Sequence, residues 1–339
     1  MTKQLPPTEL TEHLQWNPNE NTPAGNVMKA ILNSGLYKTR DDSLLQLSHE
    51  VFEDLNSFDF IDLETNALFA IALAKTGRRA LARKVMASID AKLQMPMGLP
   101  RSFHNSRMDD IQVGIEGKSC GLWALAQRAV YGLVPDKTLE LIGNNLGVGP
   151  VLSNHTFPPN VMPYIDILSS SLWAMMRSPS EAKKTVDLIR RIKDSNFVDG
   201  LAFFEGPERK YIDTETNAYW VMALCTAGKH EDAIKTIDAL HSYNNRETPI
   251  GLIRGSFTLQ GVTHIHDLYV SAKENALWVL ALQAAGRQEE AANLLDMLEK
   301  CPFKRSYGLF RIQQASPDKD TIRGDDNCLY TIALAGAGL

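Results

Sequence analysis

The sequence predicts an all-α protein in which six inner and six outer helices alternate along the chain and close into a ring. The first observation is an internal repeat. Residues 212–233 (IDTETNAYWVMALCTAGKHEDA) match residues 61–82 (IDLETNALFAIALAKTGRRALA) at ten of 22 aligned positions. The second observation is a pair of apolar patterns, one continuous and one striped, that follow each other in every copy. Repeats of this length indicate one supersecondary unit that is copied along the chain.

Six copies of the unit can be identified from two markers. The first marker is the position of Asn66, which later copies fill with Cys120, Ser170, Asn217, Asn275 and Asn327, at spacings of 54, 50, 47, 58 and 52 residues. The second marker is a Gly-Leu pair that begins at Gly98, Gly200, Gly251 and Gly308, with Gly149 standing alone in the same register. Because both markers recur together, the chain contains six related units.

Each unit first predicts an inner helix. Its apolar run, such as ALWVLAL in residues 276–282, is apolar nearly all round, which is typical of a helix buried on every side. Asp, Asn or Ser precedes the run and Gly closes it, as expected for helix caps, and we expect the marker Asn to be a capping residue. Inner helices are predicted at 63–76, 117–131, 165–176, 214–227, 272–285 and 325–336.

Each unit then predicts an outer helix with a single apolar stripe, for example RQEEAANLLDMLEK in residues 287–300. Outer helices are predicted near 42–55, 79–92, 136–145, 180–194, 230–242 and 287–299, with no strand-rich segment between the helices. The polar, Pro-rich residues 1–24 are expected to form an N-terminal arm that could contact a second subunit. Residues 25–339 are then one domain.

Six helices that are apolar on every side can all be enclosed only if the array closes on itself. The predicted architecture resembles the (α/α)6 toroid of the six-hairpin glycosidases and of the terpenoid cyclase and protein prenyltransferase superfamily. The resemblance covers residues 25–339 and rests on the order and pattern of the helices. An open solenoid of armadillo type remains the alternative.

Composition narrows the classes of partner. The net charge is −5 and no cluster of Lys and Arg is present, so we expect no nucleic-acid partner. No apolar run reaches the ~18 residues of a membrane span, and the first residues lack the apolar core of a secretory signal. The four cysteines form no CxxC pair. These features predict a cytoplasmic protein with reduced thiols and a small-molecule substrate.

The loop lengths predict which end of the ring is functional. Connections from inner to outer helices are short, such as AGK and AGR, whereas connections from outer to inner helices are long. The long loops therefore gather where the inner helices begin, an end that we call the mouth. Units three apart lie opposite each other in a ring of six, so Glu64 and Glu215 are expected to face each other across the mouth.

The mouth segments supply candidates for acid–base chemistry and for substrate binding. The candidate catalytic residues are Asp213, Glu215, Glu64, Asp267, Asp326 and His264. The candidate substrate-binding residues are Arg101, His104, Tyr211, Arg254, His266, Arg311 and Phe204. Helix capping alone would also explain the individual acids of this set.

Mixed acids, bases and hydroxyls favour an enzyme that acts on a saccharide or uronate by hydrolysis, epimerisation or elimination, without a cofactor. Four tryptophans occupy one repeat position and are expected to pack in the ring instead of binding sugar: Trp123, Trp173, Trp220 and Trp278. Because the six-hairpin toroid is shared, terpenoid cyclase or prenyltransferase chemistry is the alternative, although the Asp-x-Asp-Asp and QxxDGxW signatures are missing.

Two further alternatives remain. The prenyltransferase resemblance implies a zinc site of Asp, Cys and His, for which Asp326 and Cys328 are available together with His264 or His266. A non-catalytic toroid that binds a protein partner is the third class of function, and it predicts a groove of one charge sign instead of mixed signs.

Overall fold

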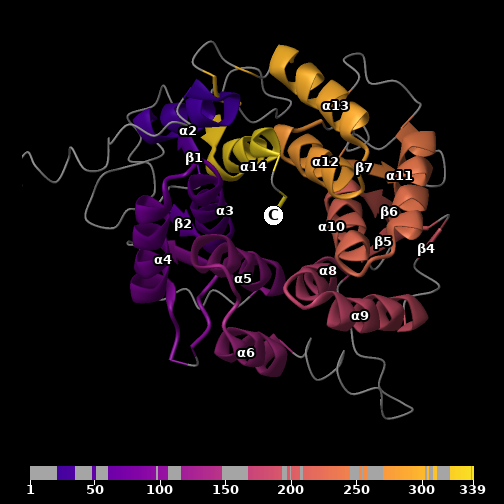
Figure 1. The fold of residues 1–339 in the computed structure, drawn as a ribbon, viewed down its shortest axis with the longest axis horizontal. Helices are drawn as coiled ribbons and strands as arrows, with labels where there is room; N and C mark the ends of the chain where they lie inside the picture. Colours follow the sequence, from indigo (N-terminus) through magenta and orange to yellow (C-terminus); the bar gives the residue numbers. More distant parts are fainter. Residues whose placement is uncertain are drawn as a thin grey trace, which may run out of the picture.

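The computed structural model describes residues 21–34, 48–50, 60–96, 98–105, 116–146, 167–192, 197–198, 200–206, 209–244, 252–253, 255–258, 270–301, 304, 308–310, 321–336 and 338–339. In these residues the helices form a closed double ring, seen along its axis in Figure 1. None of the described helices is long and apolar enough to cross a membrane.

The inner ring contains the six helices that the apolar runs predict. They are α3 (Leu63–Lys75), α5 (Gly117–Tyr131), α8 (Ile167–Met175), α10 (Thr214–Thr226), α12 (Ala272–Ala284) and α14 (Gly324–Ala335). Each contacts the next in chain order, and α14 returns to contact α3, which closes the ring. Nearly every inner-helix residue is buried, because neighbours lie on both sides and outer helices behind. The toroid prediction is confirmed, and the open solenoid is excluded.

The outer ring also has six described helices. They are α2 (Pro23–Asn33), α4 (Arg79–Leu93), α6 (Asp136–Leu146), α9 (Pro179–Ile192), α11 (His230–Asn244) and α13 (Gln288–Lys300). The last five each pack against the inner helix that precedes them, whereas α2 packs against α14 at the other end of the chain. The first outer helix therefore closes the ring on the last inner helix.

The predicted outer helix at residues 42–55 is wrong at its described positions. Residues Ser48–Glu50 form strand β1, which pairs with β8 (Thr321–Arg323). The outer helix α2 instead begins at Pro23, inside the segment predicted to be an arm. Thr22 caps it by accepting a hydrogen bond from the Gly25 N–H at 3.1 Å, and proline at the first helical position suits a helix start. Residues 1–20 of the arm lie outside the described part of the chain.

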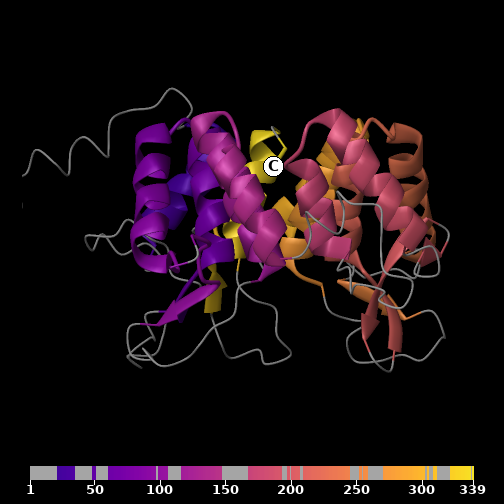
Figure 2. The same cartoon turned by 90° about the horizontal axis from the view of Figure 1, so that it is seen from below.

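Short antiparallel strands lie at the end of the ring where the inner helices begin. They are β2 (Phe60–Asp62), β3 (Phe103–Asn105), β4 (Phe197–Val198), β5 (Leu201–Gly206), β6 (Arg209–Asp213), β7 (Ser256–Thr258) and β8. Figure 2 shows them below the helices, and β2, β6 and β8 lead directly into α3, α10 and α14. The expectation of no strand-rich segment is wrong for residues 197–213, whose aromatic and β-branched residues favour strands.

In two units the marker Asn is hydrogen-bonded to the residue that follows the Gly-Leu marker. Asn275 donates from Nδ2 to the Ile253 carbonyl at 2.9 Å and accepts from the Ile253 N–H at 2.8 Å. Asn327 makes the same pair of bonds with Phe310, at 3.1 and 2.8 Å. Ile253 and Phe310 directly follow the Gly-Leu marker. At Gly308 the marker adopts a φ of 89°, a left-handed conformation that favours glycine.

The marker Asn is therefore not the helix cap that the sequence suggests. The caps are Asp62 and Asp213, which accept hydrogen bonds from the Thr65 and Thr216 N–H groups at 2.8 and 2.7 Å. The Asn lies four residues later, and its side chain donates back to the carbonyl of the cap residue. This position lets the Asn join the start of the inner helix to the preceding loop.

The four repeated tryptophans pack in the ring, as the sequence predicts. Their exposed fractions are 4% for Trp123, 3% for Trp173 and 0% for both Trp220 and Trp278. Trp220 contacts Phe197 and lies under Arg190 of α9, so its ring fills the space between inner and outer helices. These side chains are not available as sugar-stacking surfaces.

Candidate functional site

The second residue of each inner helix lies at the mouth, close to the ring axis. In chain order these residues are Glu64, Lys118, Leu168, Glu215, Lys273 and Asp325. All occupy the same repeat position, two residues before the marker Asn. Five of the six carry charge, so one position in the repeat defines the chemistry at the centre of the ring.

Ion pairs join the inner helices at this level, and the glutamates of the opposite helices α3 and α10 share the same two lysines. Glu64 Oε1 lies 2.8 Å from both Lys118 Nζ and Lys273 Nζ. Glu215 Oε1 lies 2.6 Å from Lys118 Nζ and 3.5 Å from Lys273 Nζ. Lys273 Nζ is also 3.4 Å from Asp325 Oδ2. We call Glu64, Lys118, Glu215, Lys273 and Asp325 the axial cluster.

The axial cluster places lysines where helix electrostatics disfavours them. The N-terminus of a helix carries partial positive charge, which stabilises carboxylates and destabilises cations. Lys118 and Lys273 occupy the first turns of α5 and α12, on opposite sides of the ring. Their carboxylate partners come from other helices, so tertiary contacts hold them there. Such departures from a local rule are common at functional sites.

Solvent reaches the axial cluster only partly. The exposed fractions of the side chains are 16% for Glu64, 17% for Glu215, 18% for Lys118 and 13% for Lys273. The Asp325 side chain is 1% exposed, and the Arg323 guanidinium binds both of its oxygens at 2.9 and 2.7 Å. Ion pairs in such a shielded setting are stronger than pairs on an open surface.

The lysines keep Glu64 of the cluster ionised. Burial raises the pKa of Glu64, but the Lys273 and Lys118 ammonium groups outweigh burial and bring this pKa down to about 2. Burial lowers the pKa of Lys273, but the Glu215, Glu64 and Asp325 carboxylates raise it well above its usual value. Both groups are therefore charged at neutral pH.

Four carboxyls around the axial cluster titrate at much higher pH. Burial, reinforced by the Glu215 carboxylate, raises the pKa of Glu274 to about 7 and that of Asp213 to about 6. Burial also raises the pKa of Asp62 to about 7 and the pKa of Asp326 well above its usual value. The mouth thus combines carboxyls that hold a proton near neutrality with carboxylates that do not.

Glu274 and Asp213 are the most accessible of these proton-holding carboxyls. Both are partly exposed, whereas Asp62 and Asp326 are only 3% and 4% exposed. Glu274 Oε2 has no hydrogen-bond partner among the described residues. A buried carboxyl oxygen without a partner is costly, and a substrate hydroxyl would satisfy it. Sequence reasoning missed Glu274, Lys118 and Lys273, although the repeat register marks the two lysines.

The structure brings four of the six predicted catalytic residues to the mouth. Glu64 and Glu215 meet through shared lysines, Asp213 caps α10, and Asp326 lies in the first turn of α14. The predicted residues Asp267 and His264 lie outside the described part of the chain. For Asp213 the capping explanation holds, and its raised pKa is an additional property.

Four of the predicted binding residues have a described position. Arg101 lies beside the Gly-Leu marker, and its Nε is buried without a hydrogen-bond partner among the described residues. His104 belongs to β3, and Phe204 of β5 pairs with Tyr211 of β6. The predicted binding residues Arg254, His266 and Arg311 lie outside the described residues.

The geometry gives no support to the zinc alternative. Asp326 and Cys328 are two residues apart on α14, and residues at this spacing do not face each other on a helix. Burial raises the pKa of the Cys328 thiol well above its usual value. No group of three possible metal ligands occurs in the described residues, which do not include His264.

Comparisons with known proteins support the fold. No family model matches the sequence, and no curated protein matches it in sequence. A D-mannose isomerase structure superposes with a TM-score of 0.68 at 10% identity, covering 98% of this chain and 97% of that chain. A glycosidase in complex with glucose superposes with a TM-score of 0.61 at 12% identity, covering 99% of this chain and 100% of that chain. An α-1,6-mannanase from a Salegentibacter species gives 0.56 at 11% identity, covering 93% and 97%. At such identities the likeness shows the shared toroid alone.

Proposed function

We propose that this toroid is an enzyme that acts on a small saccharide or uronate by general acid–base chemistry at the mouth. The observation that carries the proposal is the contrast between two carboxyls at the mouth. Lys273 and Lys118 bring the pKa of Glu64 down to about 2, whereas burial raises the pKa of Glu274 to about 7. Carboxyls whose environments separate their pKa values in this way can act as base and acid in one reaction. A sugar substrate is also supported by the similar structures, which are a D-mannose isomerase, a glycosidase in complex with glucose and an α-1,6-mannanase.

Each group has a distinct proposed role. Glu274 donates a proton to a sugar oxygen, because its carboxyl is protonated near neutrality and has an unpartnered oxygen. Glu215, which raises the pKa of Glu274, is the neighbouring base. Lys118 and Lys273 hold Glu64 and Glu215 in place and lower the pKa of Glu64. Asp213 is a second proton carrier beside the same carboxylate.

The charged centre favours this chemistry over isoprenoid cyclisation. A terpenoid cyclase requires a dry cavity lined by aromatic and other apolar side chains. Here the second residues of five inner helices are charged, and the four tryptophans at the shared repeat position are buried. A partner-binding groove of one charge sign is also disfavoured, because the mouth contains both carboxylates and ammonium groups.

The test is a substrate screen by proton NMR with monosaccharides, disaccharides and uronates, followed by one substitution. We expect turnover of at least one sugar, and a fall in kcat of at least about 100-fold in Glu274→Gln, because loss of a general acid typically costs that much. Glu289→Gln is the matched control, since Glu289 is an exposed first-turn glutamate on α13.

Two results would contradict the proposal. One is turnover of a prenyl diphosphate in a parallel screen without turnover of any sugar. The other is a Glu274→Gln enzyme that turns over its sugar as fast as the Glu289→Gln control.

A further inference from the structure

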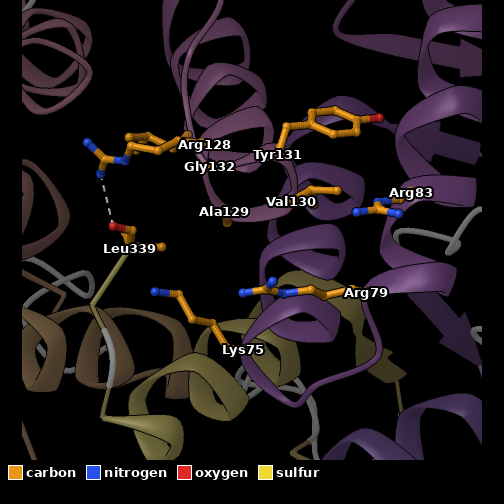
Figure 3. A pocket seen from close by; sticks show the side chains of 10 residues that line it. Lys75, Arg79, Arg83, Arg128, Ala129, Val130, Tyr131, Gly132 and Leu339 are labelled. Carbon is orange, nitrogen blue, oxygen red and sulfur yellow. Dashed lines mark hydrogen bonds between the residues drawn. The ribbon is translucent and has the colours of Figure 1, made fainter.

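A second candidate site lies at the end of the ring opposite the mouth. A cavity of about 340 Å³ is formed there by the last turns of α3 and α5 and the start of α4. Figure 3 shows Lys75, Arg79, Arg83 and Arg128 around this cavity, with Tyr131 at its border. We call these four basic residues the basic cavity set. None of the lining residues in the described part of the chain is an acid.

The positive charges of the cavity act on each other. Burial and the Arg128 guanidinium lower the pKa of Lys75, and burial lowers the pKa of Arg128. Arg128 donates to two main-chain oxygens, of Met175 at 2.7 Å and of Leu339 at 3.1 Å. These two contacts orient the guanidinium. An anion in the cavity would relieve the remaining repulsion.

Elsewhere in the outer ring, arginines pair with acids of a neighbouring outer helix. Arg190 of α9 pairs with Asp232 of α11 at 2.7 Å, and Arg287 pairs with Asp238 at 3.2 Å. Outer helices α6, α9, α11 and α13 each carry an acid in the first turn. Helix α4 carries none there and begins with Arg79. Helix α2 also lacks such an acid, so α4 is the exception among the five described outer helices that follow an inner helix.

The helix dipole explains the positions of only two of the four residues in the basic cavity set. Lys75 and Arg128 lie in the last turns of α3 and α5, where the helix dipole stabilises cations. Arg79 is the first residue of α4, where the dipole destabilises a cation, and Arg83 lies one turn further along the helix; both are exposed. The residue that precedes the helix, Arg78, makes no side-chain cap. A bound anion accounts for cations at a helix start better than the fold does.

We propose that this cavity binds the phosphoryl group of a small phosphate ester, with a monosaccharide phosphate as the fitting class of ligand. A phosphoryl dianion matches several converging cations, and arginine forms paired hydrogen bonds with phosphate oxygens. The volume lies near the lower end of the ~300–1,000 Å³ typical of small-molecule pockets. The Tyr131 side chain, 48% exposed, offers a ring and a hydroxyl to the sugar. The site is separate from the mouth.

The test is calorimetric titration at low ionic strength with glucose 6-phosphate, inorganic phosphate and glucose. We expect both phosphates to bind through this cavity and glucose not to. The Arg79→Gln/Arg83→Gln variant should weaken glucose 6-phosphate binding at least tenfold. The Lys137→Gln/Lys183→Gln variant is the charge-matched control, because it removes two exposed cations from the starts of α6 and α9 at the same end. We expect its affinity to change less than twofold.

Further arms separate the possible outcomes. Thermal unfolding of both double variants checks that they fold. Tighter binding of glucose 6-phosphate than of inorganic phosphate would support a sugar phosphate, and equal binding would support the phosphoryl group as the recognised element. The proposal is overturned if neither phosphate binds, if both double variants lose affinity equally, or if Glu274→Gln at the mouth abolishes binding.

Discussion

The two ends of the ring handle charge in different ways. At the mouth, carboxylates from three inner helices surround two lysines from two others, so each charge is compensated by a charge on another helix. At the far end, four basic side chains surround a cavity that no described acid lines. Because the fixed charges at the mouth are compensated, the charge there changes mainly when carboxyls gain or lose protons. The far end, by contrast, can bind an anion from solution. One scaffold thus supports acid–base chemistry at one end and anion recognition at the other.

Removing a cation at the mouth should have the largest effect. Lys273→Met removes the one cation that Glu64, Glu215 and Asp325 share and leaves only Lys118 between the two glutamates. Loss of one member of a shielded ion-pair network typically costs ~3–5 kcal/mol. Urea unfolding at neutral pH should show this decrease in the free energy of unfolding. Lys235→Met on exposed α11 should change it by less than about 0.5 kcal/mol. Equal values for the two variants would show that the axial cluster contributes nothing.

The dependence of stability on pH should come next in size. Asp62, Asp213 and Glu274 have folded pKa values of about 7, 6 and 7, above the values near 4 of an unfolded chain. The folded state therefore binds more protons, and its stability falls as pH rises from about 4 to 7. The pH dependence that Glu64 contributes has the opposite sign, because the stability that it provides is lost as pH falls from about 4.5 towards 2.

We expect the free energy of unfolding to be at least about 1 kcal/mol higher at pH 5 than at pH 8. Glu274→Gln should reduce this difference, because the substituted side chain does not titrate, while Glu289→Gln should leave it unchanged. A protein that is more stable at pH 8, or a Glu274→Gln variant with the full difference, would contradict these pKa values.

The smallest effect should come from removing a cation at the far end. Arg83→Gln takes one positive charge from the cavity and leaves no carboxylate in its lining unpaired. The free energy of unfolding should stay the same or rise by up to about 0.5 kcal/mol, since repulsion among the remaining cations decreases. A loss comparable to that of Lys273→Met would show that the two ends do not differ.

Much of the fold follows from the sequence because each inner helix is marked on all sides by apolar residues. The six inner helices begin within two residues of their predicted starts. The outer helix at 42–55 was mispredicted because one amphipathic stripe is a weaker signal than a fully apolar run. Helix α2 is supported by a Thr-Pro start, but its partner is α14, nearly 300 residues away, and no local pattern encodes that contact.

The candidate site was only half predictable. Glu64 and Glu215 follow from the repeat because identical segments mark opposite units of a closed ring. Lys118 and Lys273 occupy the same register, but lysine in a helix first turn has no local explanation and gave no catalytic signal. The raised pKa of Glu274 depends on burial and on Glu215 from the next helix, and both arise only after the ring has closed.

The central claim is that a carboxyl at the mouth holds its proton at neutral pH beside carboxylates that do not. The most direct test is the carbon-13 chemical shift of the Glu274 side-chain carboxyl across pH 4 to 9, assigned by its disappearance in Glu274→Gln. The account predicts a titration midpoint near pH 7. A midpoint near 4.5, the ordinary value for glutamate, would contradict it.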